Sequence, residues 1–249
     1  MSQGHAGRCY IVTGGSRGLG YATADALING GARVILVARD PARLESAVAT
    51  LGPSAIGVSG DLADPTLAAS IVAKAVAEFG RLDGAFVSVG GPPAGSVLST
   101  TDEAWHLAFD SLFVGVLRLV REVCGALESG GVIGLVLSSS AKEVLPGLTI
   151  SNGLRPGLAM LVKDLADEVG PRGIRVIGLL PGRIATDRIA EIDAAAGPEG
   201  KRRSEDRIPL RRYGSPAEFG TVAAFMMSEQ ASYVTGCLIP IDGGLLRTP

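Results

Sequence analysis

The sequence has few aromatic residues, no block of like charges and no long apolar run. Aromatic residues make up 4% of the 249 residues, and the formal net charge is −2 at neutral pH. Without a basic patch, the chain lacks the electrostatic attraction that nucleic acids or anionic membranes require. The apolar runs, such as 132–137, are too short to span a bilayer. We therefore expect a small-molecule partner, with neither nucleic acid nor membrane.

Cysteine is also scarce. Cys9, Cys124 and Cys237 are odd in number and far apart, without the paired spacing of a zinc site. They are typical of buried thiols in a reducing compartment, and we expect no metal site. The opening stretch, residues 1–8, is short and polar and has no signal-peptide pattern. The sequence predicts a soluble cytoplasmic protein.

What the sequence does contain is a regular alternation of two patterns. Short apolar runs rich in Val and Ile alternate with stretches of helical periodicity, such as 67–80. Continuous apolar strands separated by helices predict a parallel sheet covered on both faces. We predict one α/β domain over residues 1–249, a Rossmann-type doubly wound fold with helices on both faces. Its seven parallel strands are expected at 9–13, 33–38, 55–60, 84–89, 132–137, 174–180 and 238–241.

Two helical stretches and one polar segment stand out from this pattern. Residues 102–127 and 154–165 carry apolar side chains on more than one face. The sheet can cover only one face, so we expect a homo-oligomer, a tetramer or a dimer; loops packed over a thick core are the alternative. Residues 186–212 are polar and loosely patterned. We expect there a mobile insertion that closes over the substrate.

A glycine-rich segment, TGGSRGLG at 13–20, joins the first strand to the first helix. Glycines at this place let the backbone approach a pyrophosphate, which the N-terminus of the helix then binds. A simple packing turn is the alternative interpretation. The segment predicts a nucleotide site, with its cofactor-binding candidates at Gly14, Ser16, Arg17, Gly18, Leu19 and Gly20.

The second strand ends in VARD, at 37–40, where this fold distinguishes NAD from NADP. Arg39 follows the strand, and Arg17 is expected nearby. Two guanidinium groups suit a 2′-phosphate, so NADP(H) is favoured and NAD(H) is the alternative. Either arginine could instead be a solvated surface charge. Asp40, just before Pro41, is typical of a helix cap.

Four further motifs follow in order: GDLAD (60–64), PGRIATD (181–187), IPLRRYGSPAEF (208–219) and YVTGCLIPIDGG (233–244). With the glycine-rich segment, they resemble the short-chain dehydrogenase/reductase family over the whole chain, and its 3-oxoacyl-ACP-reductase-like members most. The resemblance implies a tetramer interface that includes Asp242. It also implies further cofactor-binding residues: Asp61 and Leu62 at the adenine, Gly90 under the cofactor, and Pro181, Gly182, Ile184 and Thr186 at the nicotinamide.

The expected active site departs from that family's usual pattern. The family has a Ser, a Tyr thirteen residues later, a Lys four after that, and an Asn on the preceding helix. Those positions hold Ser138, Ser151, Arg155 and Ser111. Ser151 and Arg155 come just before a helix-like stretch at 157–166. The usual Asn-Asn-Ala-Gly is VSVG at 87–90.

These replacements change the chemistry that the site can perform. A serine hydroxyl is a far weaker acid than a tyrosine, and an arginine keeps its proton. Loss of a general acid typically costs about 10²–10⁴ in rate. Arg155 can still stabilise an oxyanion. Lys142 and Glu143 are alternative proton donors, although loop residues of this kind are more often simply solvated.

Three functions remain open on this sequence. The first is an NADP(H)-dependent oxidoreductase acting on a carbonyl or alcohol substrate, in which Ser138 and Arg155 polarise the carbonyl and Ser151 or water delivers the proton. The second is a non-catalytic nucleotide-binding sensor or partner subunit, and the third is a site used for non-redox chemistry. A small hydrophobic carbonyl compound fits the first function. Acyl-ACP or acyl-CoA is an alternative substrate, because Arg207, Arg211 and Arg212 could meet an acidic carrier, although ordinary surface charge explains these arginines equally well.

Overall fold

The computed structural model describes residues 4–247, apart from the side chains of residues 195 and 196. Seven strands form one parallel sheet in the order β3-β2-β1-β4-β5-β6-β7. The predicted doubly wound α/β fold is therefore confirmed, with each strand near its expected place. The strands are β1 Cys9–Thr13, β2 Arg33–Ala38, β3 Ala55–Ser59, β4 Gly84–Val87, β5 Val132–Val136, β6 Arg175–Pro181 and β7 Cys237–Ile241.

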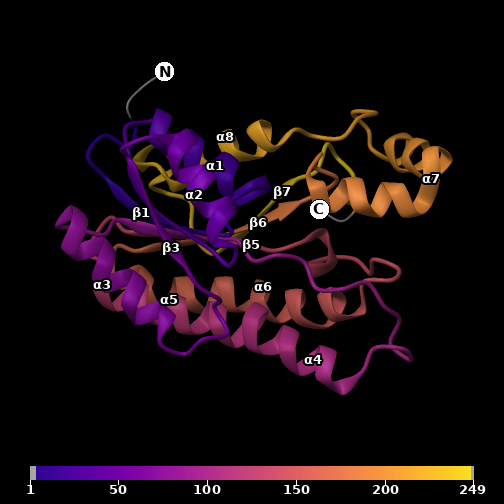
Figure 1. Ribbon diagram of the computed structural model, residues 1–249, viewed down its shortest axis with the longest axis horizontal. Coiled ribbons are helices and arrows are strands. Elements are labelled where there is room, and N and C mark those ends of the chain that lie inside the picture. The colour runs from indigo at the N-terminus through magenta and orange to yellow at the C-terminus, as the bar shows by residue number, and fades with distance from the viewer. Residues whose placement is uncertain (1–3, 248–249) are drawn as a thin grey trace.

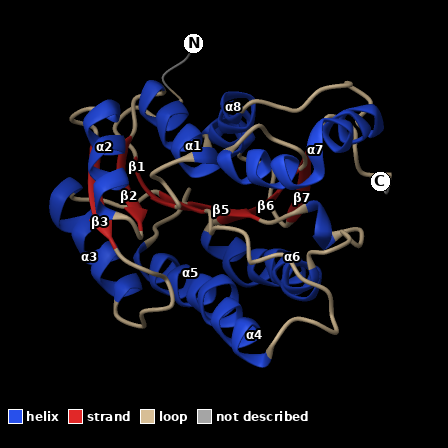
Figure 2. Ribbon diagram, turned by 45° about the vertical axis from the view of Figure 1, so that its right-hand side comes forward, coloured by secondary structure: helices blue, strands red, loops and turns tan. Residues whose placement is uncertain are grey.

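Helices cover both faces of this sheet, as Figures 1 and 2 show. One face packs against α1 (Gly18–Asn29), α2 (Pro41–Leu51) and α8 (Pro216–Met227). The other packs against α3 (Leu67–Phe79), α5 (Gly115–Ala126) and α6 (Thr149–Val169). Every residue of β1 and β5 is buried, which explains why these strands read as unbroken apolar runs.

The long apolar stretch at 102–127 is helical throughout but not uniformly so. It consists of α4 (Asp102–Phe109), a π-helical turn (Asp110–Val114) and α5. Leu107, Phe109 and the α6 residue Met160 expose 73%, 43% and 74% of their surface. These apolar side chains lie outside the core of the single chain, on the two helices where we expect a second subunit.

One expectation about a segment boundary was wrong. The helix expected near 157 begins at Thr149, so Ser151 and Arg155 lie within α6. Pro156 lies inside α6, and the helix continues through it. Residues 186–212 are mostly helical, because α7 spans Asp187–Arg207 with a kink at Gly197, whose φ is 71°; its closing over a substrate stays a prediction.

The order of the strands places the loops with the expected site residues at one edge of the sheet. The chain winds outward from β1 to β3 and then returns to β4, which lies beside β1. Parallel strands end at the same edge, so the loops after β1, β4, β5 and β6 meet there. In open sheets of this kind, ligands bind at that edge, where the strand order reverses. No helix in the described part of the chain is long and apolar enough to cross a membrane.

Candidate active site

The glycine-rich loop leads from β1 to the start of α1 in a tight turn. A Cβ atom on Gly14 would lie 2.6 Å from the Ser88 carbonyl oxygen, and φ at this glycine is +59°. Both conditions favour glycine. No side chain caps the first turn of α1, which begins at Gly18 after Arg17. The free N–H groups of that turn can therefore bind an anionic ligand.

The surroundings of this loop fit a dinucleotide. Leu62 is buried within the loop after β3, while a Cβ atom on Gly90 would contact nothing within 4 Å. The open space at Gly90 agrees with its expected position beneath a bound cofactor. Leu19 packs against the core, on the face that α1 covers. The residues present thus suit a nicotinamide dinucleotide at the carboxyl edge of the sheet.

Each arginine near the expected adenosine end is paired with an aspartate. Arg17 lies 3.0 Å from Asp187 of α7, and Arg39 lies 3.6 Å from Asp61. Arg43 lies 3.3 Å from Asp40. The pairs are largely exposed, so each one stabilises the fold only slightly and can be exchanged for a phosphate. Asp40 also accepts a hydrogen bond from the Arg43 N–H, as expected for a helix cap.

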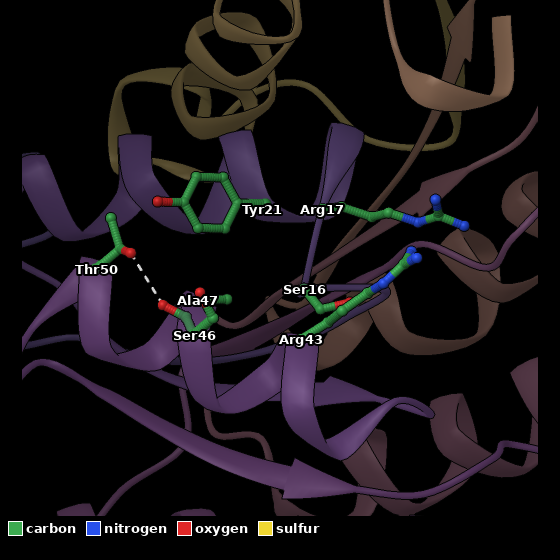
Figure 3. A pocket seen from close by; sticks show the side chains of 7 residues that line it. All are labelled: Ser16, Arg17, Tyr21, Arg43, Ser46, Ala47 and Thr50. Carbon is green, nitrogen blue, oxygen red and sulfur yellow. Dashed lines mark hydrogen bonds between the residues drawn. The ribbon is translucent and has the colours of Figure 1, made fainter. Parts of the chain in front are cut away.

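An open pocket of about 290 Å³ lies between α1 and α2. Two guanidinium groups, of Arg17 just before α1 and of Arg43 in α2, extend in the same direction (Figure 3). Ser16 lies between the two arginines, and the hydroxyl groups of Tyr21, Ser46 and Thr50 lie to the left of both in this view. The pocket combines positive charge with hydrogen-bond donors; its lining residues are Ser16, Arg17, Tyr21, Arg43, Ser46, Ala47 and Thr50.

Three serines form a connected hydrogen-bond chain after β5. The Oγ of Ser138 accepts a hydrogen bond from the backbone N–H of Ser140 over 3.1 Å. Through this bond Ser138 caps a short 3₁₀ turn. The Oγ of Ser140 lies 2.8 Å from the Oγ of Ser151 on α6. Ser140 and Ser151 expose only 4% and 5% of their surface. The structure therefore links Ser138 to Ser151 through Ser140, which the sequence interpretation did not single out.

Arg155 lies one helical turn after Ser151 and is buried, with 4% of its surface exposed. Its Nη1 donates to the carbonyl oxygen of Val136, at the end of β5, over 2.8 Å. Burial lowers the pKa of Arg155 to about 10. The group therefore remains a cation at neutral pH and places a fixed positive charge at the end of β5, two residues before Ser138.

Ser111, the fourth catalytic candidate, is turned toward its own helix. It lies in the π-helical turn and donates to the carbonyl oxygen of Leu107 over 3.0 Å. Among residues 4–247, the structure shows no hydrogen bond from Ser111 to Ser138, Ser151 or Arg155. Its catalytic role stays a prediction, although π-helical turns are frequent at functional sites.

The tyrosines take other roles. Tyr10 is buried in β1 and lies 2.9 Å from His5, and burial raises its pKa to about 12. Tyr213 donates to Asp193 of α7 over 3.0 Å. Tyr21 lines the pocket between α1 and α2, and Tyr233 is fully exposed. None of the tyrosine hydroxyls in the described chain is hydrogen-bonded to the three serines.

Two segments enclose the edge of the sheet beyond the serines. The side chain of Asn152 binds both backbone groups of Leu145, at 3.0 and 2.9 Å, which fixes the loop after β5. The start of α7 is tied to the loop after β4, because Arg188 donates to Pro92 over 2.9 Å. The loops after β4 and after β5 thus both lie next to the expected active site.

The residues after β6 border the expected cofactor site at the same edge of the sheet. A Cβ atom on Gly182 would lie 2.5 Å from the Asp242 side chain, so the turn packs closely against the chain after β7. Ile184 is buried, and Thr186 directly precedes α7. Together with Pro181, the last residue of β6, they lie at the same edge as Gly90. Their contact with nicotinamide stays a prediction.

Sequence reasoning missed two functional candidates, Ser140 and Arg43. The spacing of the resemblance runs from Ser138 to Ser151, thirteen residues later, and does not select Ser140, because a count of residues ignores how the loop folds. Arg43 occurs four residues after Arg39, and that spacing was the available signal. Among the residues that the structure describes, no three His, Cys, Asp or Glu side chains are grouped as metal ligands would be.

Comparisons with known proteins agree with this geometry. A family model described as enoyl-(acyl carrier protein) reductase matches residues 14–246. The chain is 33% identical to an L-rhamnose 1-dehydrogenase (NAD(P)(+)) of Azotobacter vinelandii, covering 94% of this chain and 95% of that one.

Solved structures show the same likeness in three dimensions. A short-chain dehydrogenase/reductase of Brucella melitensis has a TM-score of 0.94 at 27% identity, with both chains fully covered. The L-sorbose reductase of Gluconobacter frateurii, solved with NADPH and L-sorbose, has a TM-score of 0.92 at 30% identity, also with full coverage. The sequence motifs, the strand order and these likenesses agree, and the chain belongs to the short-chain dehydrogenase/reductase family.

Proposed function

We propose that this protein is an NADP(H)-dependent oxidoreductase that interconverts a carbonyl compound and an alcohol through an atypical active site. One observation carries the proposal: a hydroxyl pair and a buried cation lie at the same sheet edge as an uncapped glycine-rich helix start. When bound, a nicotinamide cofactor supplies or accepts hydride. Two relatives whose names record an activity, an L-rhamnose 1-dehydrogenase and an L-sorbose reductase, support this reaction class.

The preference for NADP(H) rests on the pocket between α1 and α2. Arg17 and Arg43 line it together with the hydroxyl of Ser16. A 2′-phosphate accepts charge-assisted hydrogen bonds from such groups. Arg39 stands at the end of β2, where the second ribose is expected. NAD(H) lacks the phosphate and would leave these cations with their aspartate partners.

The catalytic proposal assigns one task to each residue of the site. Ser138 and the Ser140–Ser151 pair offer hydroxyl groups to the substrate oxygen. Arg155 stabilises negative charge that develops on that oxygen, without giving up its own proton. Ser151 or a water molecule delivers the proton, at a lower rate than a tyrosine would.

A small molecule fits this site better than an acyl carrier protein. Arg212 makes two bonds to Glu218, at 2.9 and 2.6 Å, and Arg211 lies 3.9 Å from Asp206. Both cations are thus already neutralised by acidic neighbours in the chain. They offer little net charge to an acidic partner, which weakens the argument for acyl-ACP.

A catalytically silent nucleotide-binding protein is the second candidate. The replacement of the usual Tyr and Lys by Ser151 and Arg155 favours it, because no strong general acid is hydrogen-bonded to the described site residues. In that case, the nucleotide would bind and shift α7 through the Arg17–Asp187 pair, without any turnover.

One experiment separates these candidates. The purified protein is titrated with NADPH and NADH by fluorescence, and turnover is then followed at the nicotinamide absorbance with a panel of ketones, sugars and β-ketoacyl thioesters. Tight NADPH binding with turnover that Arg155→Ala abolishes would support the oxidoreductase. Binding without turnover on every substrate would favour the silent protein, and absence of binding would refute both.

A further inference from the structure

The loop between β5 and α6, residues 137–148, is fastened to α6 by two consecutive residues of that helix. Ser151 pairs with Ser140 near the start of the loop, with 2.8 Å between the two Oγ atoms. Asn152 holds Leu145, farther along: its Oδ1 accepts from the Leu145 N–H over 3.0 Å, and its Nδ2 donates to the Leu145 carbonyl oxygen over 2.9 Å. The stretch from 140 to 145 thus runs between two fixed points.

The second fixed point is a tight turn. The Leu148 N–H donates to the Leu145 carbonyl oxygen over 3.2 Å, across Pro146 and Gly147. Gly147 has a φ of 75°, and a proline followed by a glycine at positive φ is the preference of a type II turn. A carboxamide presents one acceptor and one donor side by side, so Asn152 binds both backbone groups of Leu145 at once. The side chain thereby docks a preformed turn onto α6.

The same turn also holds the loop after β4. The Gly95 N–H donates to the Gly147 carbonyl oxygen over 2.8 Å, and the Thr149 N–H donates to the Gly95 carbonyl oxygen over 3.3 Å. Farther back in that loop, Pro92 accepts from Arg188 of α7 over 2.9 Å. The turn docked by Asn152 therefore lies at the centre of a set of hydrogen bonds that joins α6, both loops and the start of α7.

Burial of apolar side chains contributes little to the position of these loops. Val144, directly before Leu145, exposes 78% of its surface, and Val97 and Leu98 in the other loop expose 74% and 99%. Segments with few buried apolar contacts open locally at a low cost in free energy. Loss of the Asn152 side chain should therefore loosen the two loops and leave the sheet intact.

The loop held in this way borders the substrate, if the proposed oxidoreductase function, on which this inference rests, is correct. That function places the substrate oxygen at the hydroxyl groups of Ser138 and of the Ser140–Ser151 pair. The chain continues from Ser140 directly into the stretch that ends at Leu145. Both polar atoms of the Asn152 side chain bind Leu145, so Asn152 acts through the loop and not on the substrate itself.

We propose that Asn152 is a positioning residue that raises the affinity for the substrate by holding this loop in its binding conformation. A loop that is already ordered loses little conformational freedom when the substrate binds, whereas a loosened loop must be ordered at that moment. The cost falls on substrate binding and therefore on KM. The glycine-rich loop and α1 are not part of this set of hydrogen bonds, so the affinity for NADPH is independent of Asn152.

Hydrogen exchange followed by mass spectrometry tests the docking of the turn without any substrate. In Asn152→Ala, peptides that cover 141–148 and 92–97 should exchange about tenfold faster at their slowest amides, the effect of about one lost hydrogen bond. A peptide that covers β1 should not change. Ser70→Ala is the matched control, because it removes a bond of 2.8 Å to the Leu67 carbonyl oxygen within α3. Unchanged exchange in Asn152→Ala would overturn the proposal.

Steady-state kinetics test the effect on the substrate, with the compound that the turnover panel identifies. Asn152→Ala should raise KM about three- to tenfold, with kcat within about twofold of the wild-type value and the Kd for NADPH unchanged. Ser70→Ala should change none of the three. A variant that was merely less folded would instead lose kcat at constant KM.

An unchanged KM in Asn152→Ala would overturn the proposal even if exchange became faster, because Asn152 would then hold the loop without serving the substrate. If the wild-type protein turned over no compound of the panel, the proposed function would fail and the positioning role would fail with it. The exchange comparison distinguishes that result from a failure of the docked turn itself.

Discussion

The hydroxyl oxygens of Ser140 and Ser151 lie 2.8 Å apart in the interior of the protein, although eleven residues separate them in the chain. The 3₁₀ turn after β5 carries one and the first turns of α6 carry the other. Because Ser140 also lies 3.3 Å from the Ser151 carbonyl oxygen, the turn is held to the helix at two points. The position usually occupied by a tyrosine is thus filled by a serine with a hydroxyl partner.

Removal of that partner should slow turnover without weakening cofactor binding. Ser140→Ala leaves Ser151 without its side-chain partner, and we expect kcat to fall about three- to tenfold, the worth of one hydrogen bond. Ser140→Thr retains the hydroxyl and should restore most of the rate. Ser139→Ala, equally buried in the same turn, is the matched control. An unchanged kcat in Ser140→Ala would show that the pair has no part in turnover.

The pocket between α1 and α2 should distinguish the two nucleotides. Arg43→Ala removes one of its two guanidinium groups, so the Kd for NADPH should rise about tenfold while that for NADH stays nearly constant. Fluorescence titration with both nucleotides measures the ratio. Arg33→Ala, on the far end of β2, is the control. Equal losses for NADPH and NADH would contradict a 2′-phosphate site.

Asp187 should compete with the cofactor for Arg17. Asp187→Asn breaks an exposed ion pair of 3.0 Å and leaves Arg17 free for phosphate. Pairs of this kind are weak, so we expect the Kd for NADPH to fall about two- to fivefold. The same titration measures it, with Glu191→Gln as a control on the same helix. A weaker affinity for NADPH would mean that Asp187 supports the bound state instead.

The two buried arginines should differ sharply in their contribution to stability. Arg175→Met removes the hydrogen bonds that this side chain donates to three carbonyl oxygens, and we expect the free energy of unfolding to fall by more than about 2 kcal/mol. Arg155→Met removes one hydrogen bond together with a buried, unpaired charge, so the change should stay within about 1 kcal/mol. Urea denaturation measures both. Similar losses would show that Arg155 is structural.

Stability should decline in mild acid because of His5. Its Nε2 donates to Ala224 over 3.0 Å, its Nδ1 lies 2.9 Å from the Tyr10 hydroxyl, and burial lowers its pKa. The unfolded chain then takes up the proton first, so the stabilisation is complete above about pH 6.5 and is lost as the pH falls below it. Arg8 adds repulsion to the protonated form.

The measurement is the midpoint of urea denaturation between about pH 7 and 5. His5→Asn should flatten the curve in this range, since Asn does not titrate there. A wild-type curve as steep as that of His5→Asn would show that other groups cause the pH dependence.

The exposed apolar side chains on α4 and α6 should bind a second copy of the chain. We propose an oligomer across Leu107, Phe109 and Met160, which lie outside the core of the single chain. Met160→Asp should shift the molecular mass in analytical ultracentrifugation toward the monomer, because a desolvated carboxylate is costly. Tyr233→Asp, fully exposed elsewhere, should leave the mass unchanged. A monomeric wild-type protein would refute the proposal.

The sequence by itself determined the fold, because buried parallel strands must be apolar on both faces and glycine is required where the chain approaches a phosphate. It also located the serine-rich loop and the arginine that replaces a lysine. Tertiary structure decided which serine is hydrogen-bonded to Ser151, since the path of a loop does not follow from residue counting. It also decided that Arg155 lies buried without an acid in the described chain, while Arg17 and Arg39 each find one. Spacing along a chain identifies a cation, and only the packing of distant segments around it determines whether its charge is balanced.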